Sequence, residues 1–164
     1  SKSVRFKWRE HVTKTVSENG EALEKFCNAL KDGNSEVVEQ SLNNYLKRTI
    51  SIRDTLVKKQ MKENFYHGIL LGILGFQQNW SVSSNKESGD GYSDILIETE
   101  DQETGIIIEI KYAETGNLEA VSEEALKQIE DRRYEEQLLE EGVEHILKYG
   151  IAFYKKKCKV MAVK

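Results

Sequence analysis

The stretch GIIIEIKY, residues 105–112, constrains the fold more than any other part of this sequence. Its isoleucines predict a buried strand, yet Glu109 and Lys111 interrupt the apolar run at alternate positions. Residues two apart on a strand project from the same face, so both charges should lie on one side of a sheet. Because burying an unpaired charge is costly, these side chains must be ion-paired, bound to a metal or exposed in a wet cleft.

Hydrophobic periodicity predicts helices before this strand and a mixture of strands and helix around it. Leu23, Phe26 and Leu30 lie at helical spacing, and Ser35 is the expected N-cap of a second helix. The helical period then continues over residues 51–76. The expected order after that is three strands, one long helix and a last strand or pair of strands, at residues 79–84, 94–100, 105–112, 118–141, 151–154 and 159–164. This order predicts an α/β sandwich with a mixed sheet.

The connection DQETG predicts that the second and third of these strands form an antiparallel hairpin. The register expected from this turn puts Asp94 opposite residue 110 or 111, beside Glu109 and Lys111. Two carboxylates so close together repel each other unless a cation lies between them, and Mg²⁺ uses few carboxylates together with water and phosphate oxygens. The simpler alternative is a structural ion pair between Lys111 and a carboxylate at the end of the sheet.

These residues resemble the signature of the PD-(D/E)xK nuclease superfamily, with Asp94 and then Glu109-Ile110-Lys111 on a hairpin that precedes a helix. Ser93 stands where the family commonly has proline. Five stretches also resemble, in order, the nuclease-like domain at the C-terminus of bacterial AAA-ATPase-like proteins: ENFYHGILLGIL, SSNKESGDGYSDILIE, IIIEIKYA, EEALKQIEDRRY and GIAFYKKKCKV.

The resemblance implies a domain organisation as well as a fold. It implies a restriction-endonuclease-like α/β core over residues 61–164, with a mixed central sheet flanked by helices. A helical segment, residues 1–60, would precede this core and pack on it. The same resemblance implies an AAA-type ATPase upstream or in trans, and cutting of both DNA strands would require a homodimer.

The site residues follow from the resemblance one by one. Asp94, Glu109 and the carbonyl group of Ile110 would bind Mg²⁺ or Mn²⁺, with Glu63 completing the metal site. Lys111 would be the catalytic lysine.

A polar residue of the following helix, Gln128, would lie across the active site, and Tyr134 belongs to the same motif. Tyr92 replaces the arginine usual in the GDGR loop, which would change contacts with phosphate. His67 lies four residues after Glu63 on one helical face, either as a substrate contact or as a hydrogen-bonded partner in the core.

Charge is distributed unevenly along the chain. Residues 1–62 carry a net charge of +5 and residues 63–164 carry −9, which gives the chain its net charge of −4. The basic residues 155–159, KKKCK, either contact a phosphate backbone or form a charged surface turn. Cys27 and Cys158 lack the spacing of a thiolate metal site, which suits a reducing cytoplasm. No apolar run reaches the ~20 residues of a membrane-spanning helix.

These observations predict a cytoplasmic Mg²⁺-dependent endonuclease that hydrolyses phosphodiester bonds, with DNA as the expected substrate. The alternative is a catalytically silent module that binds nucleic acid or docks onto an AAA-ATPase-like protein. The net acidity and Tyr92 favour this alternative, whereas the intact set of Asp94, Glu109 and Lys111 favours the enzyme.

Overall fold

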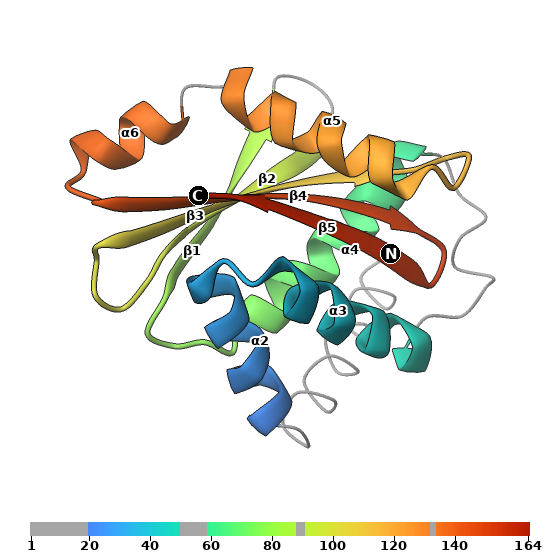
Figure 1. Ribbon diagram of the computed structural model, residues 1–164, viewed down its shortest axis with the longest axis horizontal. Coiled ribbons are helices and arrows are strands. Elements are labelled where there is room, and N and C mark those ends of the chain that lie inside the picture. The colour runs from blue at the N-terminus through green and yellow to red at the C-terminus, as the bar shows by residue number, and fades with distance from the viewer. Residues whose placement is uncertain (1–19, 50–58, 88–90, 132–133) are drawn as a thin grey trace.

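Five strands form one mixed sheet with helices on both faces (Figure 1). The computed structural model describes residues 20–49, 59–87, 91–131 and 134–164. One face carries α2 (Gly20–Asp32), α3 (Ser35–Thr49) and α4 (Lys59–Leu74), and the other carries α5 (Leu118–Asp131) and α6 (Tyr134–Glu140). None of the helices in these ranges has the length and apolar character needed to cross a membrane.

The strands lie in the sheet in the order in which they occur in the chain. They are β1 (Ser81–Glu87), β2 (Gly91–Glu98), β3 (Thr104–Tyr112), β4 (His145–Tyr154) and β5 (Lys157–Val163). Neighbouring strands are antiparallel except β3 and β4, which are parallel. A parallel pair needs a crossover connection, and α5 and α6 provide it. The predicted α/β sandwich with a mixed sheet is therefore confirmed.

Strand β3 is buried on both faces, as its isoleucines predicted. Ile106, Ile108 and Ile110 belong to the larger core that includes residues of α2, α3 and α4. Ile107 points to the opposite face and packs with a smaller cluster that contains Ile129 of α5. Because side chains alternate along a strand, Glu109 and Lys111 share the face of Ile107, beneath α5.

The predicted long helix over residues 118–141 is wrong, since the structure has two helices there. Ile129 of α5 and Leu138 of α6 both pack on the sheet in the smaller core cluster. In one continuous helix these residues would be nine positions, or about two and a half turns, apart and would face opposite directions. Two separate helices allow both side chains to reach the sheet.

The first described helices agree with the prediction except at one cap. Val37 donates its backbone N–H to Oδ1 of Asn34 at 3.3 Å, so the N-cap of α3 is Asn34 and not Ser35, which is the first helical residue. The expected helical structure at residues 1–19 and 50–58 lies outside the described residues.

Helix α3 runs along the outer edge of β5. The amide group of Asn43 accepts the backbone N–H of Cys158 at 2.7 Å and donates to its carbonyl oxygen at 3.3 Å. Glu39 accepts the N–H of Val160 at 2.9 Å. Side chains of α3 therefore satisfy backbone groups at the edge of β5 that would otherwise be free to pair with another strand.

Candidate active site

The β2–β3 hairpin brings two carboxylates directly together. Asp94 pairs with Glu109 in the register, so the expectation that it would pair with residue 110 or 111 is wrong by one or two positions. Directly opposed side chains of an antiparallel pair have Cβ atoms about 4.5–5.5 Å apart, on the same face. The corrected register therefore brings the two acidic side chains closer than the sequence predicted.

The difference in register comes from the turn. The N–H of Thr99 donates to the carbonyl oxygen of Thr104 at 3.0 Å, so the strands stay paired closer to the turn than expected. One oxygen of Asp101 holds the turn, because it accepts the hydroxyl of Thr99 at 2.7 Å and the N–H of Glu103 at 2.9 Å. Gly105 consequently belongs to β3 and not to the turn.

Burial makes the carboxylate pair chemically unusual. Asp94 is 0% exposed and Glu109 is 1% exposed. Two ionised carboxylates in such a place repel each other and lack hydration, so a shared proton or a bound cation is needed to stabilise them. A cation bound between Asp94 and Glu109 would therefore be attracted by both negative charges.

A β-bulge lies immediately before Asp94. Asn85 of β1 pairs with Asp94 and Lys86 pairs with Tyr92, which leaves Ser93 as an additional residue in β2. Bulges disrupt the ladder locally and redirect neighbouring side chains, and they are frequent next to active sites. Proline is tolerated at bulges because no ladder hydrogen bond is required there. The bulge therefore accommodates either proline or serine at position 93.

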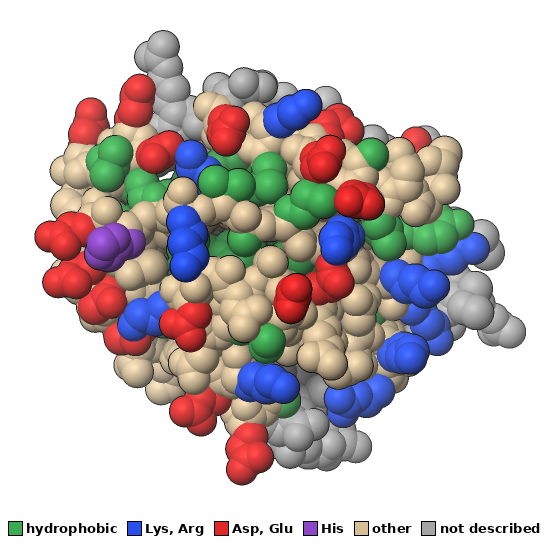
Figure 2. Space-filling view, in the orientation of Figure 1, with side chains coloured by type: hydrophobic (Ala, Val, Ile, Leu, Met, Phe, Trp, Pro, Cys, Tyr) green, Lys and Arg blue, Asp and Glu red, His purple; other side chains and the backbone are tan. Residues whose placement is uncertain are grey.

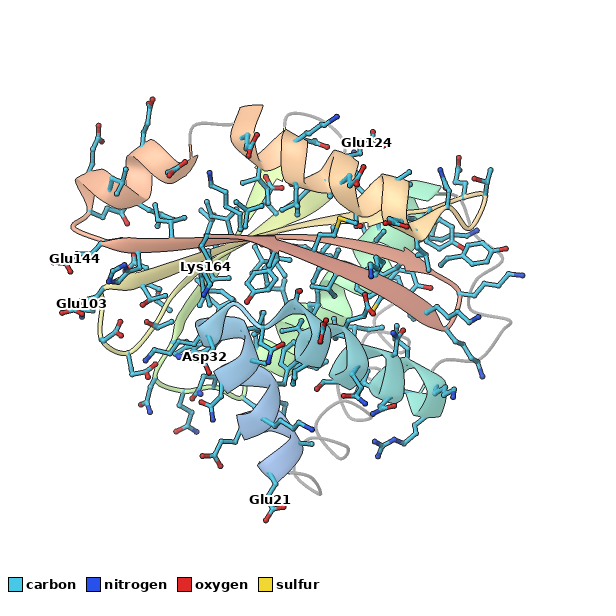
Figure 3. The ribbon with its side chains drawn as sticks, viewed as in Figure 1. Glu21, Asp32, Glu103, Glu124, Glu144 and Lys164 are labelled. Carbon is cyan, nitrogen blue, oxygen red and sulfur yellow. The ribbon has the colours of Figure 1, made fainter. Side chains whose placement is uncertain are left out.

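Lys111 is held over the same face by α5. Its Nζ atom lies 3.7 Å from Oε1 of Glu124, and the Lys111 side chain is 17% exposed. Glu124 itself is largely exposed at the outer surface of α5 (Figure 3). Gln128 is half-buried one turn later on the same helical strip, and its role across the site remains a prediction.

Gly150 allows α5 to approach the sheet beside the carboxylate pair. It is the parallel partner of Glu109 in β4. A Cβ atom at this position would lie 2.3 Å from the carbonyl oxygen of Ser122 and 2.9 Å from the backbone nitrogen of Leu126. Only glycine leaves space for this contact, so Gly150 positions the helix that carries Glu124 and Gln128.

Helix α4 contacts the ends of both site strands from the other face of the sheet. Glu63 accepts the backbone N–H of Tyr112 at 3.2 Å, next to Lys111. His67 is 3% exposed and hydrogen-bonds to the backbone of Asp94. Burial lowers the pKa of His67 because the imidazolium would lose hydration, and the hydrogen bond to Asp94 partly offsets this effect. Both residues thus support the site strands.

The donor set fits a hard divalent cation with few protein ligands. No group of three or more His, Cys, Asp or Glu side chains in the described ranges is arranged to hold a metal ion. Asp94 and Glu109 alone supply two carboxylates, and Ile110 follows Glu109 with its side chain in the larger core. Mg²⁺ is commonly bound in this way, through one or two carboxylates with waters and substrate phosphate oxygens.

The fold and this site define a restriction-endonuclease-like α/β domain. The chain belongs to the PD-(D/E)XK nuclease superfamily, whose family description matches residues 61–163. A search of curated proteins found no match. The family match confirms the resemblance inferred from Asp94, Glu109 and Lys111, and it supports a nuclease-type activity.

Sequence reasoning missed two residues of the site, Glu124 and Gly150. A signal for Glu124 was present, because it lies four residues before Gln128 and therefore on the same helical strip. Gly150 carried no such signal, since its role depends on the path of α5 across the sheet. Tyr92 lies in β2 and Tyr134 begins α6, but their side chains are outside the described part of the chain.

Proposed function

We propose that the chain is a Mg²⁺- or Mn²⁺-dependent nuclease that hydrolyses phosphodiester bonds in DNA. The observation that carries this proposal is the direct pairing of two buried carboxylates, Asp94 and Glu109, with Lys111 on the same face two residues later. A structural ion pair would need one carboxylate and would not need to bury two. A homodimer and an AAA-type ATPase partner remain predictions.

Each residue has a role in this proposal. Asp94, Glu109 and the carbonyl group of Ile110 would hold the ion. Glu63, which accepts the N–H of Tyr112, would complete the metal site. A bound divalent ion supplies Lewis-acid polarisation of a phosphate and lowers the pKa of water.

Lys111 places an ammonium group beside the carboxylates, where it stabilises the negative charge that develops on the phosphate oxygens during hydrolysis. Gln128, half-buried on α5, would orient the substrate strand or the attacking water across the site.

Two variants separate a catalytic lysine from a structural one. Plasmid and single-stranded DNA are incubated with Mg²⁺ or Mn²⁺ and with the wild type, Lys111→Ala or Glu124→Gln. We expect Lys111→Ala to lose cleavage by about 100-fold or more, as for removal of one group that stabilises transition-state charge. Glu124→Gln should keep cleavage within a few-fold, because an exposed ion pair contributes only about 0–1 kcal/mol.

Equal losses in the two variants would show that the ion pair, and not the lysine charge at the phosphate, is what matters. Absence of cleavage by the wild type with either metal ion, together with undetectable metal binding, would contradict the nuclease proposal. It would favour the catalytically silent module instead.

A further inference from the structure

Three consecutive lysines, Lys155–Lys157, form the β4–β5 turn at the same end of the sheet as the candidate active site. Strands β3 and β4 are parallel, and Tyr112 at the end of β3 pairs with Phe153 of β4. Tyr154 pairs with Lys157 across the turn, so the loop contains only two residues. The turn therefore extends just beyond the strand ends that carry Glu109 and Lys111 (Figure 1).

Two further lysines flank this turn. On α3, Glu39 contacts Val160, and Asn43, four residues later, contacts Cys158. Lys47 is a further four residues along the same face of α3, which places it beside the β4–β5 turn. On the other side, the Nζ atom of Lys62 lies 4.5 Å from the centroid of the Tyr112 ring.

Figure 2 shows Lys and Arg side chains gathered on the side of the molecule where this turn and the end of α3 lie. Acidic side chains gather over α5 and α6 and at the opposite end of the sheet. The charge asymmetry seen along the sequence is thus also an asymmetry in space. We call Lys47, Lys62 and Lys155–Lys157 the basic surface.

The lysines of the basic surface differ in their partners from three partly buried lysines elsewhere in the fold. Lys31, Lys111 and Lys148 each lie within 4 Å of a carboxylate. None of the lysines of the basic surface has such a partner among the residues that the structure describes. Positive charges gathered on one side of the molecule repel one another, and an anionic ligand would reduce that repulsion.

The turn is also held in a fixed conformation. Lys155 has a φ of 51°, a left-handed conformation that is uncommon for lysine and easy for glycine or asparagine. Its carbonyl oxygen accepts the hydroxyl of Tyr66 at 2.6 Å, and its ammonium group lies 5.1 Å from the Tyr154 ring centroid. A backbone turn that is already ordered loses little conformational entropy when it binds a ligand, which favours affinity.

We propose that the basic surface binds the sugar-phosphate backbone of DNA to one side of the bond that is cut. This assignment rests on the proposed function. Lys155 is three residues beyond Ala152, the partner of Lys111 on the neighbouring strand, which corresponds to about 10 Å along the strand. DNA advances about 3.4 Å per nucleotide, so the turn contacts phosphates roughly three nucleotides from the active site.

The test is a binding measurement that does not depend on cleavage. Fluorescence anisotropy of a labelled DNA duplex is followed in EDTA over a range of salt concentrations. The basic variant is Lys156→Ala/Lys157→Ala, and the matched control Lys25→Ala/Lys127→Ala removes the same charge from exposed positions on α2 and α5. Thermal melting verifies that all variants are folded, and Lys156→Arg/Lys157→Arg should retain binding.

We expect the basic variant to bind about tenfold more weakly, with a salt dependence reduced by about two phosphate contacts, and the control to bind like the wild type. Equal affinity and salt dependence in the basic variant and the control would overturn the assignment. So would tighter binding of an RNA duplex that depends on the same lysines.

The two proposals can fail separately. A wild type that cuts DNA while the basic variant binds and cuts equally well would overturn this surface and leave the nuclease proposal intact. A wild type that binds DNA through the basic surface but does not cut it with Mg²⁺ or Mn²⁺ would support the surface and contradict the nuclease.

Discussion

Gly150 determines how closely α5 approaches the carboxylate pair. Gly150→Ala would place a Cβ atom 2.3 Å from the carbonyl oxygen of Ser122. Relief of this overlap requires α5 to move away from the sheet, which we expect to lower the free energy of unfolding by about 1–3 kcal/mol. Because α5 carries Gln128, which would lie across the site, cleavage should also decrease. Urea unfolding and plasmid cleavage measure the two effects.

Gly68 provides the matched control for this substitution. It is exposed on α4, and a Cβ atom there would have no neighbour within 4 Å. Gly68→Ala should therefore stabilise the helix by about 0.5–1 kcal/mol. If Gly150→Ala unfolds at the same urea concentration as Gly68→Ala, the close contact between α5 and β4 is not a constraint on the fold.

Single residues of the site show what the sequence allowed and what it did not. Charges at alternate positions of an apolar strand were enough to place Glu109 and Lys111 on one face, and the hairpin was enough to bring Asp94 to them. The register was missed because Asp101 tightens the turn through its own hydrogen bonds. Such side-chain contacts leave no periodic signal in a sequence.

At the scale of elements, Asn43 attaches α3 to the edge of β5. Asn43→Ala removes two hydrogen bonds to the backbone of Cys158 and leaves its N–H without the 2.7 Å partner. We expect a loss of about 1–3 kcal/mol in the free energy of unfolding. The neighbouring Asn44 is exposed, so Asn44→Ala should change it by less than about 0.5 kcal/mol. Equal losses in chemical denaturation would show that the contact with β5 contributes nothing.

The end of β2 and the end of α6 are linked by two acidic residues. The pKa of Glu98 is raised from its ordinary value of 4.5, first because it shares a hydrogen bond with Glu141, then because of partial burial and the charge of Glu141. A carboxyl group with a raised pKa stabilises the fold at low pH, and that contribution is lost as pH rises through the folded-state pKa. At neutral pH the two carboxylates repel each other.

Glu141→Gln should therefore raise the melting temperature at neutral pH, because the amide can donate a hydrogen bond to ionised Glu98. This gain should shrink at acidic pH, where protonated Glu98 already shares a hydrogen bond with Glu141 in the wild type. Thermal melting at the two pH values measures the difference. A gain of the same size at both would contradict the shared hydrogen bond.

Helices and strands were predicted correctly where the hydrophobic periodicity is regular. They were missed where tertiary packing determines the bounds of an element. The helical spacing of α2 and α3 agrees with the structure, and all the predicted strands are present. Their bounds differ, because β1 and β2 extend into the segment expected as a turn and β4 begins at His145, six residues before the expected start. The division of the predicted helix at residues 118–141 was missed because Ile129 and Leu138 must both face the sheet, which only the tertiary structure requires. The N-cap of α3 was predicted one residue too late because asparagine and serine are both favourable N-cap residues, and Asn34 and Ser35 are adjacent.

At the scale of the whole molecule, the sheet separates structural from chemical roles. The larger core joins α2, α3 and α4 to the face that carries Ile106, Ile108 and Ile110. The opposite face carries Asp94, Glu109 and Lys111 beneath α5, at the end of the sheet near the basic surface. A chain with a net charge of −4 thus still gathers positive charge on one side, at the end of the sheet where the site strands end.

Calorimetric titration of Mn²⁺ into the wild type and Asp94→Asn tests most directly whether two carboxylates hold one ion. The variant keeps the shape of the buried side chain but removes one of the two charges. The wild type should bind one ion per chain, and Asp94→Asn should lose most of that affinity while its metal-free form melts no lower than the wild type. Identical isotherms for the two proteins, or no binding by the wild type, would contradict a shared cation at Asp94 and Glu109.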